Sequence, residues 1–122
     1  MASQPLEVQI FGVKKSADTR KAQRFFSERR VRAHFVDLME KAMSEGELRR
    51  FVDRFGVEGL IDRTSRRFGE LGLQHANLNS SRWLERLAVE PLLLRLPLVR
   101  RLGKPGDVTI GDAESIWRTW FL

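Results

Sequence analysis

The sequence predicts an α/β fold built on one mixed sheet of four strands, with a helical region inserted between the second and third strands. Three observations support this prediction. Apolar segments with strand character lie near both ends of the 122-residue chain, amphipathic helix patterns follow them, and the stretch from about 44 to 96 has broken helical periods. The predicted order is β-α-β, then the insertion, then β-β-α. A chain of this length is expected to form a single domain, 1–122.

The first strand and the turn after it are predicted from a two-residue alternation. Leu6, Val8 and Ile10 are apolar and alternate with polar residues, which places a strand at about 6–11. Gly12 follows directly, and a glycine permits the chain to turn. A helix is expected after this turn.

A helix at about 18–29 and a second strand at 31–38 complete the first β-α-β unit. Ala22, Phe25 and Phe26 fall on one face of the helix, and charged residues cover the opposite face. The following segment is rich in valine and phenylalanine, which favour strands. This unit is the first half of the predicted sheet.

The insertion opens with the strongest helix signal in the chain. Ser44 and Glu47 have the spacing of a capping box, in which each side chain bonds the other residue's backbone amide. Apolar residues then recur at helical spacing until Gly56, where the helix is expected to stop: Leu48, Phe51, Val52 and Phe55. From 57 to 95 the helical pattern is divided into shorter pieces.

The last part of the chain predicts a hairpin and a closing helix. Pro97 separates the insertion from a strand at 98–101, and the residues at 104–107 have turn chemistry. A returning strand is expected at 108–110. The closing helix, at about 112–121, has four bulky side chains available for burial: Ile116, Trp117, Trp120 and Phe121.

The loop after the first strand is laid out like a redox site without its thiol. An apolar strand leads into a short loop, and the loop opens a helix whose free N–H groups point at whatever lies there. A thiol at position 16 would be a nucleophile of lowered pKa in this setting. The residue is Ser16, and the chain has no cysteine, which excludes disulfides and thiolate metal sites.

Ser16 lacks the partners that a serine nucleophile needs. A hydroxyl requires a general base, and the only histidines, His34 and His75, show neither triad nor metal-ligand spacing. The sequence therefore predicts no catalytic residue and no metal site. Ser16 or Thr19 is expected to cap the helix instead, a role that suits both residue types.

The formal net charge is +6, and arginine contributes most of the positive residues. Such a charge favours acidic partners or polyanions, but acidic residues are interspersed through most of the chain. Nucleic-acid binding is therefore a secondary prediction, and steep salt dependence would reveal it. Residues 1–7 lack the features of a leader, and the apolar stretch at 92–99 is too short and interrupted for a membrane span, so we expect a cytoplasmic protein.

Six segments, in the expected order, resemble one protein family. They are 11–16 (FGVKKS) with 20–22 (RKA), 35–38 (FVDL), 44–56, 68–73 (FGELGL), 91–99 (PLLLRLPLV) and 108–111 (VTIG). By these segments the chain resembles the arsenate reductase-related (ArsC/Spx) family over nearly its whole length. The resemblance implies a thioredoxin-like fold with an added helical region, which agrees with the predicted order of elements.

The resemblance implies where a catalytic thiol would stand. Enzymes of this family use one cysteine at the end of the first loop, sometimes in a Cys-x-x-Cys pair, and Ser16 and Thr19 occupy these two places. No resident cofactor is expected, with glutathione as the one exception. The arrangement resembles that of glutathione transferases. By this resemblance, Ser16 of this chain would donate a hydrogen bond to the thiolate of a bound thiol such as glutathione.

The resemblance also implies an oxyanion pocket lined by arginines, one of which immediately precedes a proline that is typically cis. Pro97 matches this proline, but Leu96 precedes it, and Arg95 lies one step earlier. The second arginine would fall near Thr64, and Arg63 is again one step away. Two anion ligands are thus displaced from the family positions.

Basic residues surround the start of the first helix. Lys14, Lys15 and Arg20 either hold an anion at the helix dipole or form a solvated loop, and the sequence favours neither. The full set of candidate anion- or thiol-binding residues is Lys14, Lys15, Ser16, Thr19, Arg20, Arg63, Arg95 and Pro97.

The sequence thus predicts an arsenate reductase-like protein that lacks the catalytic cysteine and acts as a non-catalytic binding or regulatory module. The expected partner is another protein, or an anionic or thiol-bearing small molecule. The Spx branch, which the chain resembles, is implied to act by contacting RNA polymerase and not by catalysis. The alternative is a reductase or glutathione-dependent enzyme that uses an external thiol bound near Ser16.

Overall fold

The computed structural model describes residues 5–104 and 106–121. Two sequence-based expectations fall partly outside these residues: the absence of a leader, which concerns residues 1–4 as well, and the predicted turn, which includes Pro105. Among the described residues, no helix is both long enough and apolar enough to cross a membrane.

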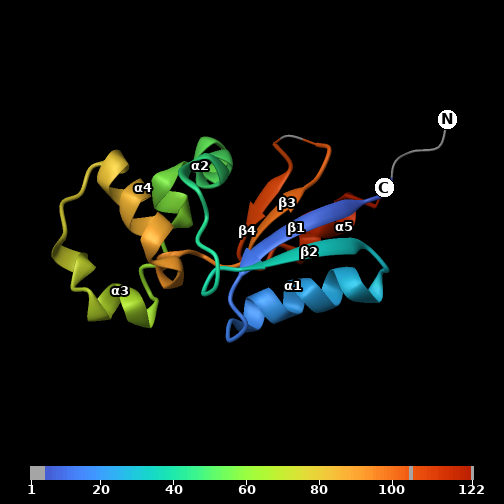
Figure 1. The fold of residues 1–122 in the computed structure, drawn as a ribbon, viewed down its shortest axis with the longest axis horizontal. Coiled ribbons are helices and arrows are strands. Elements are labelled where there is room, and N and C mark those ends of the chain that lie inside the picture. Colours follow the sequence, from blue (N-terminus) through green and yellow to red (C-terminus); the bar gives the residue numbers. More distant parts are fainter. Residues whose placement is uncertain (1–4, 105, 122) are drawn as a thin grey trace.

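A mixed sheet of four strands forms the centre of the fold, in the order β2-β1-β3-β4 (Figure 1). The strands are β1 (Glu7–Gly12), β2 (Arg32–Asp37), β3 (Leu98–Arg101) and β4 (Val108–Ile110). β1 pairs parallel with β2 and antiparallel with β3, and β3 pairs antiparallel with β4. The predicted α/β class and mixed sheet are confirmed, and β2 and β4 form the two edges.

One face of the sheet is covered by α1 (Ala17–Glu28) and α5 (Glu114–Thr119). Phe26 and Trp117 are fully buried there, with ring centroids 5.3 Å apart. Trp117 Nε1 donates a hydrogen bond to Thr109 Oγ1 at 2.8 Å, so the polar atom of the indole keeps a partner inside the core.

The helix α5 is shorter than the closing helix predicted at 112–121. Trp117 and Trp120 lie three residues apart and take the buried side, whereas Ile116 and Phe121 are 48% and 43% exposed. The expectation of burial was therefore wrong for the last two side chains. A helix of six residues has fewer than two turns, so it presents only one narrow stripe to the sheet.

The insertion packs against one end of the other sheet face (Figure 1). Its elements are α2 (Glu45–Leu60), α3 (Arg66–Glu70) and α4 (Ser80–Val89), with 3₁₀ turns at Leu73–His75 and Pro91–Leu93. Phe51 of α2 meets Phe11 of β1 edge to face, with ring centroids 6.1 Å apart. The apolar core is thus continuous from the insertion to the sheet.

The predicted start of α2 and the predicted break at Gly56 are both confirmed. Ser44 Oγ accepts a hydrogen bond from Glu47 N at 3.1 Å, and Glu47 Oε1 accepts one from Ser44 N at 3.0 Å. At Gly56 the backbone leaves the helical region, with φ 75° and ψ 162°, but a further helical turn continues to Leu60. A positive φ is inexpensive for glycine, so the chain kinks there and the element continues.

The chain returns from the insertion to the sheet through Leu96 and Pro97, whose peptide bond is cis. The carbonyl of Pro97 accepts a hydrogen bond from Gly111 N at 2.9 Å, which ties this segment to the end of β4. β3 and β4 then form the predicted hairpin, and Asp107 N donates to Lys104 O at 3.1 Å beside its turn. This path brings the end of the insertion opposite the start of α1.

Candidate functional site

Ser16 caps the N-terminus of α1, as the sequence predicts. Its Oγ accepts a hydrogen bond from Thr19 N at 3.1 Å, and its carbonyl accepts one from Arg20 N at 3.0 Å. The side chain is partly buried, and its hydroxyl donates to no acceptor in the described part of the chain. The oxygen serves as the cap, and the hydroxyl hydrogen remains available to a ligand.

Thr19 is fully buried against Gly12. A Cβ added at Gly12 would lie 2.5 Å from both Thr19 Oγ1 and Thr19 Cγ2, so only glycine fits at this position. Thr19 Oγ1 has no hydrogen-bond partner among the described residues. Of the two positions that the family resemblance aligns with cysteines, Ser16 lines the cleft described next and Thr19 does not.

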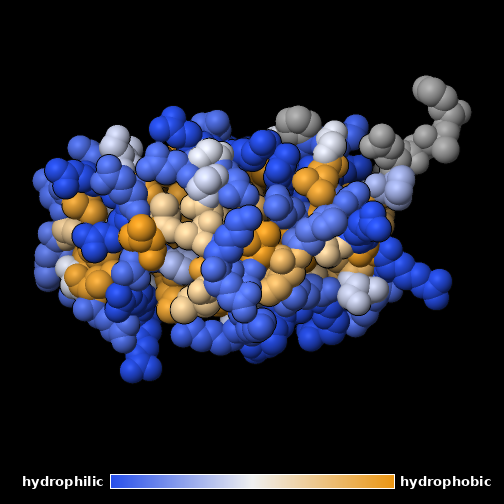
Figure 2. All heavy atoms as spheres, viewed as in Figure 1, coloured by the Kyte–Doolittle hydropathy of each residue, from blue (hydrophilic) through white to orange (hydrophobic). Residues whose placement is uncertain are grey.

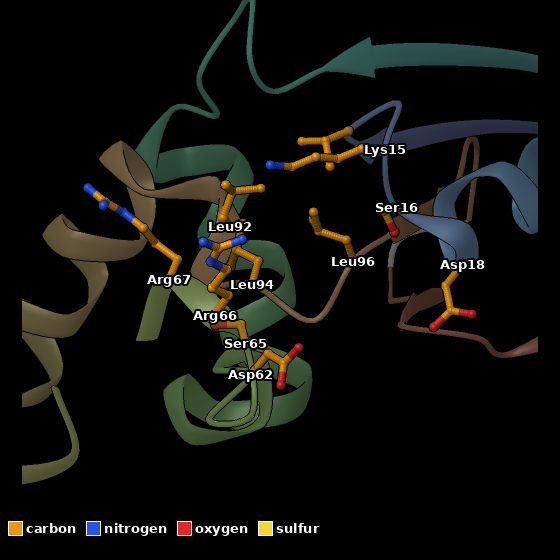
Figure 3. A pocket seen from close by; sticks show the side chains of 11 residues that line it. Lys15, Ser16, Asp18, Asp62, Ser65, Arg66, Arg67, Leu92, Leu94 and Leu96 are labelled. Atoms are coloured by element: carbon orange, nitrogen blue, oxygen red, sulfur yellow. The ribbon is translucent and has the colours of Figure 1, made fainter. Parts of the chain in front are cut away.

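A cleft of about 360 Å³, here named the loop cleft, lies between the first loop and the insertion (Figure 3). Its apolar lining comes from both regions: Val13, Leu92, Leu94 and Leu96. Lys15 and Arg66 bring positive charge to the cleft. Asp18 and Asp62 bring negative charge, so Ser16 stands in a cleft of mixed charge with apolar walls.

A second hollow of about 330 Å³, here named the side pocket, adjoins the loop cleft and shares Asp18, Asp62 and Leu96 with it. Arg95 lines the side pocket, and its Nε donates to Ile61 O at 3.1 Å. Its two terminal nitrogens form no hydrogen bond within the described residues. A guanidinium held at Nε and open at its far edge is oriented to bind a carboxylate.

The three aspartates of the side pocket differ in their partners. Asp112 accepts a hydrogen bond from Lys21 Nζ at 2.6 Å, and this bond holds the pKa of Asp112 below its usual range. Asp62 Oδ1 accepts from Thr64 N at 3.0 Å and from Thr64 Oγ1 at 2.6 Å. Asp18 and Asp62 form no ion pair within residues 5–104 and 106–121.

Two neighbouring arginines of α3, Arg66 and Arg67, differ in how firmly ion pairs hold their side chains. Arg67 donates to Glu90 through Nε and a terminal nitrogen, both at 2.9 Å, and its side chain points away from Ser16 in Figure 3. The Arg67 guanidinium holds the pKa of Glu90 below its usual range. Arg66 is 94% exposed, and its Nε lies 3.4 Å from Glu70 Oε2. Arg66 is therefore the α3 cation that can reorient toward a ligand.

Four of the residues predicted for the site lie at or directly behind the two cavities. Lys15 and Ser16 line the loop cleft, and Arg95 lines the side pocket. Pro97 is buried behind Leu96, which lines both. The structure thus brings the first loop and the end of the insertion together.

The other four predicted residues, the buried Thr19 and three cations, lie outside both cavities. Lys14 Nζ is 3.8 Å from Asp37 Oδ2, and the Arg20 guanidinium donates to the backbone oxygen of Lys14 at 2.8 Å. Arg63 binds Glu58 with a nitrogen–oxygen distance of 2.7 Å. Each of these cations pairs with a group of the protein beside the two cavities.

Sequence reasoning missed three residues that line the loop cleft: Asp18, Asp62 and Ser65. The sequence leaves open whether Arg66 faces the pocket or is a solvated residue of the insertion, and in the structure it lines the cleft. Ser65 caps α3 by accepting from Phe68 N at 3.2 Å, and its spacing before an aromatic residue is the one local signal. Asp62 N donates to Leu93 O at 2.8 Å, which fixes Asp62 beside a segment far along the chain. No local pattern encodes such a contact.

The site holds binding groups without a nucleophile and base in contact. His34 pairs with Glu7 on the sheet, and His75 is exposed in a 3₁₀ turn, so neither histidine lines the loop cleft. The Ser16 hydroxyl has no hydrogen bond to a histidine or carboxylate among the residues described. Within the same residues, no group of three or more metal-binding side chains could hold a metal ion.

Comparisons with known proteins agree with this architecture. The model of the ArsC family matches residues 11–120. An arsenate reductase of Neisseria meningitidis serogroup A is 28% identical over 101 residues, which cover 80% of this chain and 86% of that protein. The solved structure of the protein YffB has a TM-score of 0.81 at 22% identity, covering 92% of this chain and 96% of that one. The arsenate reductase from Vibrio cholerae has a TM-score of 0.78 at 19% identity, with 94% and 98% covered. This chain, which contains no cysteine, belongs to the ArsC family and has a thioredoxin-like fold.

Proposed function

We propose that this ArsC-family chain is a non-catalytic binding protein whose loop cleft and side pocket hold a small zwitterionic thiol peptide of the glutathione type. The observation that carries the proposal is the composition of the side pocket. An open guanidinium, Arg95, lines it together with two carboxylates that have no ion-pair partner in the described chain, Asp18 and Asp62. Such a set suits a head group that bears both an ammonium and a carboxylate.

The side pocket supplies a partner for each charge of an α-amino acid group. The terminal nitrogens of Arg95 offer N–H donors to the carboxylate. The open oxygen of Asp62 and the carboxylate of Asp18 attract the ammonium. A bare oxyanion such as arsenate fits this pocket less well, because the two carboxylates repel it. The pocket therefore favours a zwitterion.

Ser16 supplies the donor for the sulfur of the bound peptide. Its hydroxyl hydrogen is available, and the start of α1 and the Lys15 ammonium favour an anion at this point. A bound thiol is expected to shift toward its thiolate there. The amide and carbonyl of Leu96 form no hydrogen bond within the described residues, so an extended peptide can pair with them.

Catalysis is not part of this proposal. Family chemistry uses a protein thiol, and this chain has no cysteine to supply one. Ser16 has no base in hydrogen-bond contact to activate it, as far as the described residues extend. The competing hypothesis is an enzyme that borrows the thiol of glutathione bound near Ser16, and it makes a different prediction in an activity assay.

Titration with reduced glutathione, followed by amide chemical shifts, tests the proposal. We expect the amides of Ser16 and Leu96 to shift. Asp62→Asn and Arg95→Gln should each weaken binding about tenfold, because each removes one charged partner. Arg63→Gln is the matched control, since Arg63 lines neither cavity, and it should change the affinity less than about twofold.

The outcomes separate binding from catalysis. Unshifted amides at about 10 mM glutathione, far above the dissociation constant expected for a specific site, would contradict the proposal. We expect no arsenate reduction above that of glutathione alone. Turnover by the chain would establish the external-thiol enzyme instead, and amide shifts with arsenate but not with glutathione would assign the loop cleft to an oxyanion.

A further inference from the structure

Among the described residues, no strand pairs with the outer edge of β2. β2 lies at one end of the sheet order, and Arg32–Asp37 pairs only with β1. Leu38 N donates to Gly12 O at 2.9 Å. Because the hydrogen-bonding direction alternates along a strand, the amides and carbonyls of Ala33 and Phe35 point away from β1. Neither residue forms a hydrogen bond outside the sheet in the part of the chain that the structure describes.

A groove of about 620 Å³ runs beside this edge, between β2 and α1. Val31, Ala33 and Phe35 give it an apolar side, and Gln23 and Ser27 of α1 give it a polar side. Figure 2 shows hydrophobic side chains gathered over β2 on this face, bordered by hydrophilic ones. Unpaired backbone next to open apolar surface is the combination that an added strand covers.

The charge that lines this groove is positive. Arg30 and Arg32 are exposed, and neither forms an ion pair among the described residues. No described carboxylate lines the groove. The groove therefore attracts a negatively charged segment and repels a basic one.

The two faces of β2 predict the pattern of an added strand. Val31, Ala33 and Phe35 lie on the α1 side. The alternation along the strand directs Arg32 and His34 to the opposite face, and Arg32 also lines the groove at its rim. Side chains of an added strand lie beside those of β2 on each face. Positions on the α1 side are therefore expected to be apolar, and positions next to Arg32 are expected to be acidic.

We infer that the edge of β2 is a docking site for a partner protein, which adds to the sheet an extended segment of alternating apolar and acidic residues. The backbone of the segment pairs with Ala33 and Phe35. Its apolar side chains fill the groove against Phe35, and its acidic side chains meet Arg32. The groove shares no lining residue with the loop cleft, so this inference stands independently of the proposed glutathione site.

A synthetic hexapeptide, acetyl-Val-Glu-Val-Glu-Val-Glu-amide, tests the inference with the full chain. Binding should slow hydrogen exchange at the amides of Ala33 and Phe35 at least about fivefold, because they acquire acceptors. Arg32→Glu should weaken binding about tenfold. Arg49→Glu is the charge-matched control, since Arg49 is exposed on α2 and outside the groove, and it should leave the affinity within about twofold.

Two modified peptides separate strand pairing from charge attraction. A peptide with lysine in place of glutamate should not bind, because it meets two unpaired arginines. A peptide with N-methyl groups on the amides of one edge keeps its charge but cannot donate to the carbonyls of β2. It should lose binding as well, and this result does not depend on any protein variant.

Three results would overturn the inference: unchanged exchange at Ala33 and Phe35, equal affinity for the lysine peptide, or displacement of the hexapeptide by glutathione. Sedimentation of the chain alone tests a second copy as the occupant. A dimer that protects the same two amides without peptide would assign the edge to self-association and overturn the inference too. If circular dichroism shows that Arg32→Glu does not fold, the inference is tested instead by comparing the binding of the hexapeptide and of its N-methylated form to the wild-type chain.

Discussion

The two faces of the sheet are stabilised in different ways. Beneath α1 and α5 the core is closed and aromatic, and Phe26 and Trp117 are fully buried in it. On the other face, side chains cap all three α-helices of the insertion, whereas in the first layer Ser16 caps α1 and α5 has no side-chain cap. Both layers also carry ion pairs, Lys21–Asp112 in the first and Arg67–Glu90 in the insertion. The loop cleft lies where these regions meet, and its first-loop wall includes the Ser16 cap of α1.

This difference predicts how substitutions will act. Loss of a packed side chain under α1 should lower the free energy of unfolding of the whole chain, because it leaves a cavity that the surrounding side chains do not fill. Loss of a polar contact in the insertion should have a smaller effect that varies with pH or remains local. Four predictions, from the largest effect to the smallest, test the contrast.

Trp117→Ala should have the largest effect. It empties a fully buried site and removes the donor to Thr109 Oγ1, so we expect the free energy of unfolding to fall by about 3–5 kcal/mol in urea denaturation. Ile116→Ala on the same helix is the control, because Ile116 is 48% exposed, and it should cost less than about 0.5 kcal/mol. Similar losses in both variants would remove the contrast between packed and exposed positions.

Gly12→Ala should destabilise the fold by about 1–3 kcal/mol, because the added methyl group would lie 2.5 Å from the Thr19 side chain. Thr19→Ala in the same chain removes both clashing atoms, so the double variant should recover part of the loss. Gly69→Ala is the matched control, since an added Cβ there meets nothing within 4 Å. Additive losses in the double variant would show that the two residues are not coupled.

Ser16→Ala should cost about 1 kcal/mol, because it removes the acceptor for Thr19 N at the start of α1. Ser16→Gly is the control, since glycine is tolerated at this position and should cost only a few tenths of a kcal/mol. Ser44→Ala removes the corresponding acceptor for Glu47 N on the insertion. If each cap acts only on its own helix, Ser16→Ala should accelerate hydrogen exchange in α1, and Ser44→Ala should accelerate it in α2. Faster exchange in both helices in either variant would contradict this expectation.

Glu90→Gln should give the smallest effect, and the effect should depend on pH. The Arg67 guanidinium lowers the pKa of Glu90 in the folded chain. The pair therefore stabilises the fold fully above the pKa of about 4.3 that Glu90 has in the unfolded chain. This stabilisation is lost as the pH falls through the lower pKa of Glu90 in the folded chain. The fall in Tm between about pH 5 and pH 3 should therefore be shallower in Glu90→Gln. Glu85→Gln, at an exposed position of α4 without an ion pair in the described chain, should keep the wild-type slope.

Most of the fold was predictable because its signals are local. The alternation before Gly12 placed β1, and the Ser44–Glu47 box placed the start of α2 within one residue. The failures arose where a local pattern met a tertiary limit. Ile116 has the apolar character of a core residue, but α5 is too short to bury it beside Trp117. By contrast, Gly56 interrupts the helical backbone as the sequence predicts, and the helical turn that follows to Leu60 lies in the segment predicted to hold shorter helical pieces.

The candidate site was only half predictable for the same reason. Lys15 and Ser16 lie in a loop whose role follows from the strand before it and the helix after it. Asp62 reaches the cleft through contacts of the segment that includes Ile61, which bridges to Leu94 much later in the chain. The register between two such segments is set by packing, and neither sequence alone encodes it.

The contact between Gly12 and Thr19 also has a thermodynamic consequence for the residues that it encloses. These two positions hold the ends of the segment 13–18 together, and Ser16 N donates to Val13 O at 3.1 Å within it. A loop closed in this way has little conformational entropy left to lose when it is occupied. Calorimetry of ligand binding at this loop is therefore expected to record a favourable enthalpy and only a small loss of conformational entropy.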